Sequence, residues 1–511
     1  MRIRPETIRA GLTDGRRNGP LAIAHRGASS YAPENTLEAF RKAAALGADM
    51  WELDVRLSAD GVCMVAHSDD LAATTGESGR VSKTPYGRLR RIPGLKGGFI
   101  PRFDQVLELA QDLGAGLYVE LKDADAGPEV VRLLTEKKFE PAVIGSFLAG
   151  VIRSLKASGC SWPLSILVPA QADPFALAEQ TGADMIHLCW EGSAPNPQKL
   201  ITSELLERAR FQGLEVVLWH EERREIVADL IGLPVWGICS SAPEMLKPFV
   251  ASTQRPIQVV CHRGAGFFAP ENTLSAARIC YNQGFQFVEI DVRTTADGMP
   301  IVMHDATVDR TTNGHGLVRD MTWAEIERLD AGAWFDPFYT GEPVARLEDL
   351  LRLAHGNGGL YIEIKDGREA AVLDAVVGAG MEQRCFYWSE HAVCLERLRR
   401  AAPSASLMLR RKDVANLPQA IDRLCPYIVE FEWPHADPDD LEICRKAGVK
   451  RMALYLGTDA DVFRVLIRLN FELINLDRSD IFKRVYRSNI AEVIRRDETP
   501  QITGGRSRLH E

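Results

Sequence analysis

The sequence predicts an α/β protein made of two tandem TIM barrels, each a (β/α)₈ fold. Three observations lead to this fold class. The two halves of the chain carry the same motifs, each half alternates short apolar runs with longer helical patterns, and conspicuous polar residues follow the ends of the apolar runs. TIM barrels carry their active sites at the carboxyl ends of the strands, so the third observation favours a barrel over the alternative, a doubly wound open sheet.

The repeat covers almost the whole chain. His-Arg-Gly at residues 25–27 recurs at 262–264, and Pro-Glu-Asn-Thr at 33–36 recurs at 270–273, both 237 positions later. Solenoid repeats have periods of only about 20–50 residues, so a complete domain is duplicated. The predicted parts are an N-terminal extension (residues 1–20), a first barrel (21–249), a linker (250–256), a second barrel (257–488) and a polar, disordered tail (489–511).

Eight strands are predicted in the first half from short apolar runs separated by helical patterns. The second half gives the same series, from Gln258–Cys261 to Leu473–Asn475. In chain order the strands of the first half are Leu21–Ala24, Met50–Val55, Gly116–Leu121, Ala142–Gly145, Leu164–Val168, Met185–Leu188, Glu215–Trp219 and Val235–Cys239.

Local signals predict the remaining elements. Asn35, with Glu38 three residues on, is predicted to cap the first helix. Val62–Ala66 follows an Asp-Gly turn and is predicted to be a hairpin partner of the second strand. Helices are predicted at Thr36–Leu46, Phe103–Leu113 and Ser203–Gln212, among others.

The composition is that of an ordinary globular protein, with 46% hydrophobic and 26% charged residues. The net charge of −9 argues against a nucleic-acid partner, because phosphate backbones bind basic surfaces. Ten cysteines without zinc-ligand spacing indicate a reducing compartment. Since we find neither a signal peptide nor an apolar stretch long enough to span a bilayer, we expect a cytoplasmic protein.

Three acidic residues in each half indicate a metal site. Glu52 and Asp54 lie two positions apart on a predicted strand, hence on one face, and Glu120 ends the next strand of the series. Carboxylates that converge on a barrel interior repel one another unless a cation joins them, and oxygen ligands favour Mg²⁺ or Ca²⁺. The alternatives are an edge strand with solvated acids and, for Glu120, an ordinary pair with Lys122. The second copy offers Glu289, Asp291 and Glu363.

Two histidines in each half are candidates for acid–base chemistry. His25 ends the first strand and His67 follows the hairpin strand. Phosphodiester cleavage needs one group to deprotonate the nucleophile and another to protonate the leaving alkoxide, and Arg26 is a candidate phosphate ligand. Each histidine taken alone has a structural alternative, a satisfied strand end. The recurrence of the whole set at His262, Arg263 and His304 favours function.

These motifs resemble the glycerophosphodiester phosphodiesterase family, within the superfamily that includes phosphatidylinositol-specific phospholipases C. The shared pattern is His-Arg-Gly, Pro-Glu-Asn-Thr, Glu-x-Asp-Val-Arg, Asp-Gly before a second histidine, and Glu-x-Lys, over residues 20–249 and 257–486. The resemblance implies TIM-barrel enzymes that hydrolyse glycerophosphodiesters to an alcohol and glycerol 3-phosphate with one divalent cation per barrel. By analogy with the phospholipases C, it also implies attack on phosphorus by the neighbouring glycerol hydroxyl.

The resemblance implies roles by position. It implies that His25, His67, His262 and His304 are catalytic, that Arg26, Lys122, Arg263 and Lys365 bind phosphate, and that Glu52, Asp54, Glu120, Glu289, Asp291 and Glu363 hold metal.

The two copies differ after the second histidine. The family often has His-Asp there, followed by Arg-Thr-Thr. The second copy keeps Asp305 and Arg310, whereas the first has Ser68 and Ala73. We therefore expect the second barrel to be the faster enzyme. The alternative functions are a lysophospholipase D and a chain in which one barrel is a non-catalytic binding module.

Overall fold

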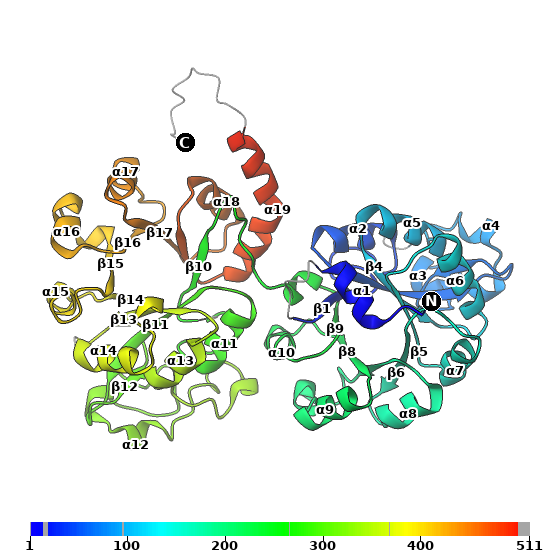
Figure 1. Ribbon diagram of the computed structural model, residues 1–511, viewed down its shortest axis with the longest axis horizontal. Helices are drawn as coiled ribbons and strands as arrows, with labels where there is room; N and C mark the ends of the chain where they lie inside the picture. The colour runs from blue at the N-terminus through cyan, green and yellow to red at the C-terminus, as the bar shows by residue number, and fades with distance from the viewer. Residues whose placement is uncertain (1, 14–18, 95–96, 265, 367, 499–511) are drawn as a thin grey trace. The chain divides into compact units, whose positions relative to one another are not determined.

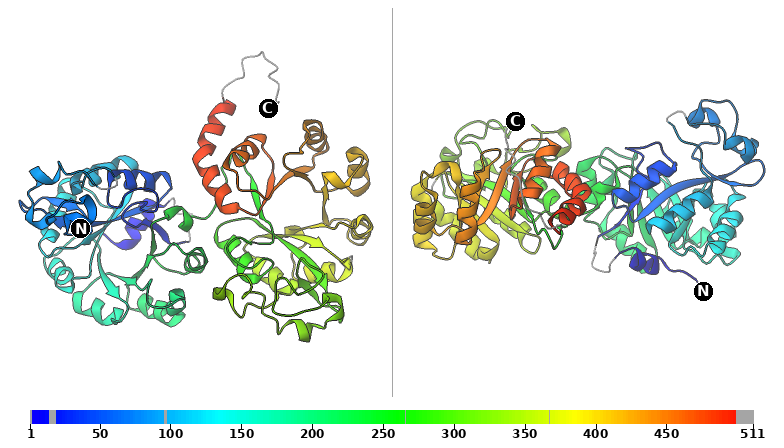
Figure 2. Two further views of the ribbon diagram at one scale, coloured as in Figure 1. Left: turned by 180° about the vertical axis from the view of Figure 1, so that it is seen from behind. Right: turned by 90° about the horizontal axis from the view of Figure 1, so that it is seen from above.

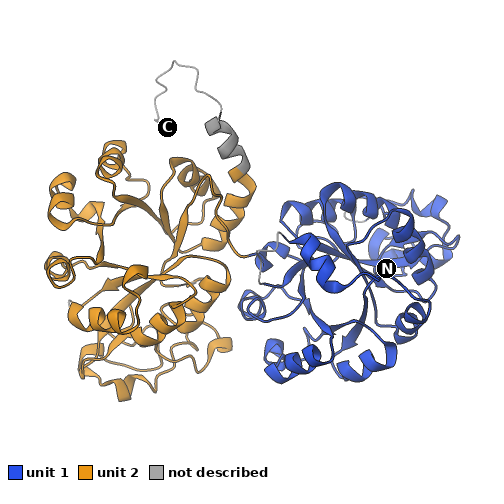
Figure 3. Ribbon diagram, viewed as in Figure 1, with its two compact units in different colours: residues 1–247 blue, residues 248–511 orange. Residues whose placement is uncertain are grey.

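The computed structural model describes residues 2–13, 19–94, 97–264, 266–366 and 368–498. It divides into two compact units, Met1–Lys247 and Pro248–Glu511 (Figure 3). Each unit contains one copy of the sequence repeat, and each is described by itself below.

The first unit is a closed barrel. β1 (Leu21–Ala24) pairs in parallel with both β2 (Met50–Leu57) and β9 (Gly237–Ser240), which closes a sheet whose other strands follow in chain order. This closure confirms the predicted TIM barrel. β3 (Cys63–Val65) pairs antiparallel with β2 and confirms the predicted hairpin. The remaining strands are β4 (Gly116–Leu121), β5 (Ala142–Ser146), β6 (Leu164–Pro169), β7 (Met185–Cys189) and β8 (Glu215–His220).

The helices of this unit form an outer layer around the strands (Figures 1 and 2). Short helices α3 (Leu71–Thr75) and α4 (Tyr86–Leu89) follow the hairpin. The longer helices are α2 (Leu37–Ala45), α5 (Phe103–Leu113), α6 (Ala126–Glu136), α7 (Ala149–Ala157), α8 (Pro174–Thr181), α9 (Ser203–Phe211) and α10 (Arg224–Leu230).

The N-terminal segment belongs to the folded unit. Helix α1 (Pro5–Leu12) buries Ile8, which is 3% exposed, in a core cluster with Leu21, Met50 and Trp236. The indole N–H of Trp236 also donates to a backbone oxygen of α1, at 3.3 Å. Residues that we predicted as an extension therefore help to fill the barrel core.

The start of α2 differs from the prediction. Its N-cap is Thr36, whose hydroxyl accepts a hydrogen bond from the backbone N–H of Ala39 at 3.2 Å. Asn35 instead has a left-handed backbone, with φ of 57°, and directs its amide to Asp54. The cap prediction is wrong because Asn35 and Thr36 are both residue types that cap helices. Thr36 is the cap, and Asn35 binds Asp54 instead.

The second unit repeats this topology. β10 (Gln258–Cys261) pairs with β11 (Phe287–Thr294) and β18 (Leu473–Leu476), and β12 (Pro300–Val302) is the antiparallel hairpin strand. The other strands are β13 (Gly359–Ile364), β14 (Cys385–Trp388), β15 (Ser406–Arg410), β16 (Ile428–Glu432) and β17 (Lys450–Tyr455). The longer helices before the last are α11 (Leu274–Asn282), α13 (Leu347–Ala354), α14 (Glu369–Gly378), α15 (Ala392–Ala401), α16 (Leu417–Leu424), α17 (Pro438–Ala447) and α18 (Ala460–Leu469).

The last helix, α19 (Ser479–Glu498), runs past residue 488, where the polar tail was predicted to begin. Phe482 and Tyr486 of α19 pack on Phe249, with ring centroids 5.9 and 5.2 Å apart, so Phe249 belongs to the second unit rather than the first. Residues 499–511 of the predicted tail lie outside the described residues. Within the part of the chain that is described, no helix has the length and apolarity needed to cross a membrane.

Candidate active site

A tight turn after the first strand brings backbone N–H groups to the site. Arg26 and Gly27 both have left-handed conformations, with φ of 54° and 81°. A Cβ on Gly27 would lie 2.8 Å from the backbone of Ala39, so glycine lets the turn pack against α2. The backbone N–H of Arg26 thereby donates to Glu52 Oε2 at 2.9 Å. The turn at residues 263–264 has the same conformation, with φ of 51° and 80°.

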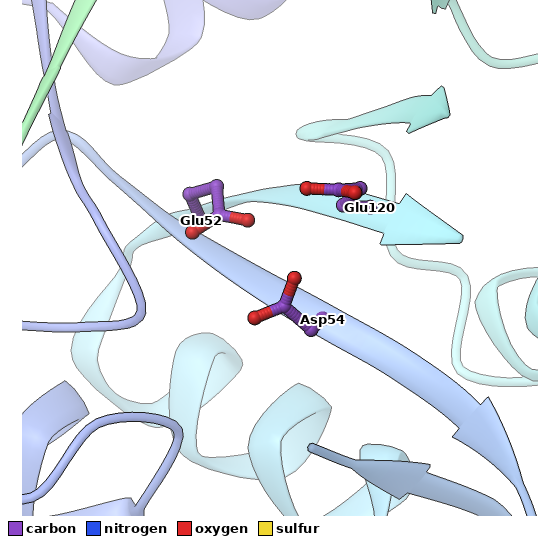
Figure 4. Close-up of side chains that lie close together, drawn as sticks. All are labelled: Glu52, Asp54 and Glu120. Atoms are coloured by element: carbon purple, nitrogen blue, oxygen red, sulfur yellow. The ribbon is translucent and has the colours of Figure 1, made fainter. Parts of the chain in front are cut away.

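Three carboxylates lie close together on the neighbouring strands β2 and β4 (Figure 4). Glu52, Asp54 and Glu120 each place an oxygen within 4.8 Å of the others, and Asp54 lies opposite Glu120 in the strand register. Their exposures are 3%, 0% and 7%, which excludes a solvated edge strand. The second barrel gathers Glu289, Asp291 and Glu363 in the same way.

Burial and mutual repulsion oppose ionisation of these acids. Desolvation, followed by the charges of Asp54 and Glu120, raises the pKa of Glu52 well above its ordinary value. In the second barrel, desolvation and Asp291 raise the pKa of Glu289 to about 8. The clusters therefore require compensating positive charge to be fully ionised near neutral pH.

A lysine supplies part of this charge. Lys122 Nζ lies 3.0 Å from Asp54 Oδ1 and also contacts Glu120. Burial lowers the pKa of Lys122, but the two carboxylates outweigh burial and raise it. The simple Lys–Glu pair considered from the sequence is present, but it also reaches a second acid of the cluster. Lys365 makes the matching contacts in the second barrel.

An arginine and an asparagine complete the surroundings of Asp54. Arg26 Nε lies 3.3 Å from Asp54 Oδ2, and its Nη1 lies 3.0 Å from Glu34 Oε2. Asn35 donates from Nδ2 to Asp54 Oδ2 at 2.8 Å and accepts from the Asp54 N–H at 3.3 Å. The second barrel repeats the asparagine contact between Asn272 and Asp291, at 2.8 Å. Asp54 is therefore fixed from two sides.

The donor set suits a hard divalent cation. All six acids are carboxylates with closely spaced oxygens, the ligand type that Mg²⁺ and Ca²⁺ prefer. Against three buried carboxylates, Arg26 and Lys122 leave one negative charge in the first cluster when the acids are ionised. A divalent cation would convert this to one positive charge, which matches a singly charged phosphodiester.

Both histidines of the second barrel have a carboxylate partner. His262 Nδ1 lies 2.7 Å from Asp477 Oδ1, and His304 Nδ1 lies 2.7 Å from Asp305 Oδ1. Burial lowers the pKa of His262, but Glu289 and Asp477 outweigh burial and raise it. A carboxylate at Nδ1 fixes the imidazole orientation and leaves Nε2 to face a substrate.

Arg310 ties the loop beside His304 to the first turn. Its Nε lies 2.6 Å from Asp305 Oδ2, and its Nη1 and Nη2 lie 3.0 and 2.8 Å from the carboxylate oxygens of Glu271. Glu271 also binds Arg263, at 3.0 Å. A continuous set of ion pairs therefore orders this side of the second site.

The first barrel has different partners at the matching positions. Ser241 follows the last strand where Asp477 follows it in the second barrel, and its hydroxyl lies 3.4 Å from His25 Nδ1. The His25 ring stacks on His220, with centroids 4.2 Å apart and planes 7° apart. Desolvation, followed by His220, lowers the pKa of His25 well below its ordinary value. His25 is thus held in the neutral form, whereas His262 is supported as a cation.

Residues 25–245 and 262–417 match the glycerophosphoryl diester phosphodiesterase family. The chain belongs to this family. The expected enzyme class, a phosphoric diester hydrolase, is confirmed with it. Both matched segments begin at a candidate catalytic histidine, so each barrel carries its own phosphodiesterase motifs.

Individual phosphodiesterases match about one barrel. The glycerophosphodiester phosphodiesterase of Caldanaerobacter subterraneus subsp. tengcongensis is 32% identical over 216 residues, 41% of this chain and 89% of that protein. A putative glycerophosphodiester phosphodiesterase of Bacillus subtilis is 40% identical over 128 residues, 25% of this chain, and the chain spans only 53% of its length. A solved glycerophosphodiester phosphodiesterase of Agrobacterium tumefaciens is 39% identical, covers 44% of this chain and 99% of its own, and has a TM-score of 0.43.

The structure groups the predicted site residues of this phosphodiesterase in each barrel, and it adds residues that the sequence did not single out for the site. His25 and His67 line one pocket of about 800 Å³. Asn35 recurs as Asn272, and this recurrence was the available signal. Asp477 has Ser241 as its counterpart, so comparison of the two copies could not detect it.

Proposed function

We propose that both barrels hydrolyse glycerophosphodiesters to an alcohol and glycerol 3-phosphate. The observation that carries this proposal is the duplicated cluster, in which a lysine contacts two of three buried carboxylates beside a histidine-bearing turn. Metal ligands, phosphate-binding cations and an acid–base pair are together what phosphodiester cleavage requires. Because the motif set recurs in both barrels, it favours two enzymes over an enzyme joined to a binding module.

We infer that each cluster holds one divalent cation, Mg²⁺ or Ca²⁺. When bound, the cation neutralises the carboxylates and polarises the phosphoryl group. The residues that would hold it are Glu52, Asp54 and Glu120 in the first barrel and Glu289, Asp291 and Glu363 in the second.

The side chains of each barrel bind the phosphate and move protons. In the second barrel, Arg263 and Lys365 bind phosphate oxygens. One of His262 and His304 takes the proton of the neighbouring glycerol hydroxyl as it attacks phosphorus, and the other protonates the alkoxide that leaves. Water then opens the cyclic phosphate while the histidines exchange roles. If an analogue without the 2-hydroxyl turned over at the normal rate, the result would contradict this route and favour direct attack of water on phosphorus.

Turnover of glycerophosphoethanolamine by the purified full chain tests the proposal. We expect EDTA to abolish turnover, and Mg²⁺ or Ca²⁺ to restore it, because the buried acids need a cation to coexist as carboxylates. Full activity in a preparation shown to be metal-free by elemental analysis would contradict the metal requirement. The cytoplasmic location and a purely small-molecule partner stay predictions, to be tested by cell fractionation and by nucleic-acid binding.

A further inference from the structure

We propose that the two barrels act on different alcohols: the first accepts a glycerophosphodiester with a bulky apolar alcohol, and the second prefers a small polar alcohol. This inference rests on the proposed function. It comes from matched positions at the two sites, where ion pairs of the second barrel are replaced by uncharged residues in the first. In most of these replacements both members of an ion pair differ between the barrels, so the charge of the surroundings changes and not only one side chain.

The first barrel has an open pocket beside its histidines. The pocket of about 800 Å³ is lined by His25 and His67, by Tyr31, Phe99 and Ile100, and by the acidic Glu34 and Glu222. Phe99 is 55% exposed, so its ring is accessible to a ligand. Tyr31 is 43% exposed, but its hydroxyl donates a hydrogen bond to Glu244 and Lys42 Nζ lies 5.8 Å from its ring centroid. Binding pockets of roughly 300–1,000 Å³ take ligands much larger than ethanolamine.

The second barrel has a small cavity at part of the matching positions. The cavity between Glu271, His304 and Val344, which correspond to residues 34, 67 and 100, measures about 10 Å³. That is room for roughly one water molecule. Arg310 bridges Glu271 and the loop beside His304, and Ala73 stands at its position in the first barrel. The first barrel therefore has no ion-paired arginine at this position of its pocket lining.

A second replacement lies on the strands that face the site. Arg410 Nε lies 2.9 Å from Glu430 Oε1, and its guanidinium stacks 3.5 Å from the ring centroid of Trp388. Arg410 and Glu430 are opposite each other in the strand register. The residues in the same register of the first barrel are Leu167 and His187. An ion pair beside the second metal cluster is thus an uncharged pair in the first, where Leu167 and His187 are buried inside the barrel.

The next outward positions on these strands show the same change. Lys412 Nζ lies 2.8 Å from Glu432 Oε2. Pro169 and Cys189 lie opposite each other at the matching positions of the first barrel. Charged residues of the second barrel therefore continue beyond Arg410 and Glu430, at positions where the first barrel has uncharged residues.

The segments after β5 and β14 extend the contrast. Phe147 and Leu148 are 45% and 44% exposed just after β5. Glu390 and His391 occupy the matching positions after β14 and approach each other to 3.7 Å. The apolar side chains thus lie at the carboxyl end of the first barrel, where the active sites of such barrels open.

Several positions change in the opposite direction. Leu456 follows β17 and is 44% exposed, where Glu221 follows β8, and Trp334 in the longer loop of the second barrel is 40% exposed. Phe267 and Phe268 of the second barrel replace Ser30 and Tyr31 of the first. The face of Phe267 is covered by Arg478, whose guanidinium carbon lies 3.7 Å from the ring centroid. Phe267 nevertheless stays 52% exposed, so the second barrel keeps some apolar surface beside its ion pairs.

The physical consequence is a difference in desolvation. An alkyl chain placed on the second wall removes water from ion pairs, which is unfavourable, and it must also displace Arg310. The same chain in the first pocket covers the exposed ring of Phe99, which is favourable. Alcohol size and polarity should therefore separate the two activities.

Two substrates with the same chemistry test this proposal: the sn-glycerol 3-phosphate esters of ethanol and of octanol. Both release a primary alkanol, so their kcat/KM ratio measures recognition of the alkyl chain. In the His304→Ala chain only the first barrel is expected to be active, and in the His67→Ala chain only the second barrel is. We expect the octyl-to-ethyl ratio to be at least tenfold higher for His304→Ala. Equal ratios would overturn the inference, whereas no hydrolysis of either ester would overturn the proposed function and the inference with it.

A matched variant checks the cause. In the His304→Ala chain, the double change Ser68→Asp with Ala73→Arg rebuilds the ion pair of the second barrel. We expect this double variant to lower the octyl-to-ethyl ratio at least fivefold. Phe99→Ser should also lower the ratio, and it serves as a second test if the double variant does not fold. Phe211→Ala, at a 92% exposed position on α9, is the control and should leave the ratio unchanged. An unchanged ratio in Phe99→Ser and in a folded double variant would overturn the proposal.

Discussion

Single residues beside the histidines distinguish the barrels more than the histidines do. Both copies keep two histidines, but the carboxylate of Asp477 at His262 is replaced by the hydroxyl of Ser241 at His25. A carboxylate stabilises the imidazolium that forms during proton transfer, and a hydroxyl does so far less. The second site is therefore better prepared for acid–base catalysis.

We expect Asp477→Asn to lower the pKa of His262. Burial already lowers that pKa, and Glu289 and Asp477 together raise it, so removing one carboxylate shifts it down. The ionisation due to His262 in the pH profile of kcat/KM should move to lower pH, and kcat/KM should fall about tenfold to a hundredfold. The profile is measured in the His67→Ala chain, with Asp374→Asn at an exposed position of α14 as the control. A profile that kept its midpoint would show that the Asp477 contact does not support the His262 cation.

The sequence predicted those site residues that recur in both copies. Glu52, Asp54 and Glu120 could be found because each recurs and because strand alternation places the first two on one face. The His262–Asp477 contact spans 215 positions, and one of its members has no counterpart, so only the fold reveals it. Asn35 was assigned to a helix cap because its local signal is the same for a cap and for a loop residue that binds Asp54.

Among the elements, strands were predicted more reliably than the N-terminal helix. The strands repeat in two copies with clear apolar runs, whereas α1 is eight residues long and occurs once. Its Ile8 packs against Trp236 and its neighbours in the core of the first barrel. Such a short amphipathic segment cannot be recognised as part of a barrel until the surface that it covers is known.

We expect Ile8→Ala to destabilise the first unit by about 2 kcal/mol, because it leaves a cavity where a 3% exposed side chain is packed. Thr7→Ala, on the exposed side of the same helix, is the matched control and should change stability by less than about 0.5 kcal/mol. Chemical denaturation followed by tryptophan fluorescence measures both variants. Equal stability of the two would mean that α1 contributes little to the fold in solution.

At the scale of the whole molecule, the chain holds two copies of one proposed catalytic set with different residues around them. The acids, the arginine and the lysine keep their positions in both barrels, because a change in any of them would leave buried charge uncompensated. The residues around them carry no such restriction. Duplication therefore allows one site to diverge in substrate while the other remains ordered by ion pairs.

The two barrels should differ in their turnover of a small polar substrate. On glycerophosphoethanolamine, we expect His304→Ala to remove most of the activity of the full chain and His67→Ala to remove little. His304 is oriented by Asp305 and its loop is fixed by Arg310, whereas the first barrel has Ser68 and Ala73 at these positions. Loss of positioning groups can reduce a rate by about a hundredfold while the reacting groups remain. Turnover of the two single variants and the double variant measures this, with thermal melts to confirm folding. Greater damage from His67→Ala would identify the first barrel as the main enzyme, and the carboxylate partners of the second would then serve its stability rather than its rate.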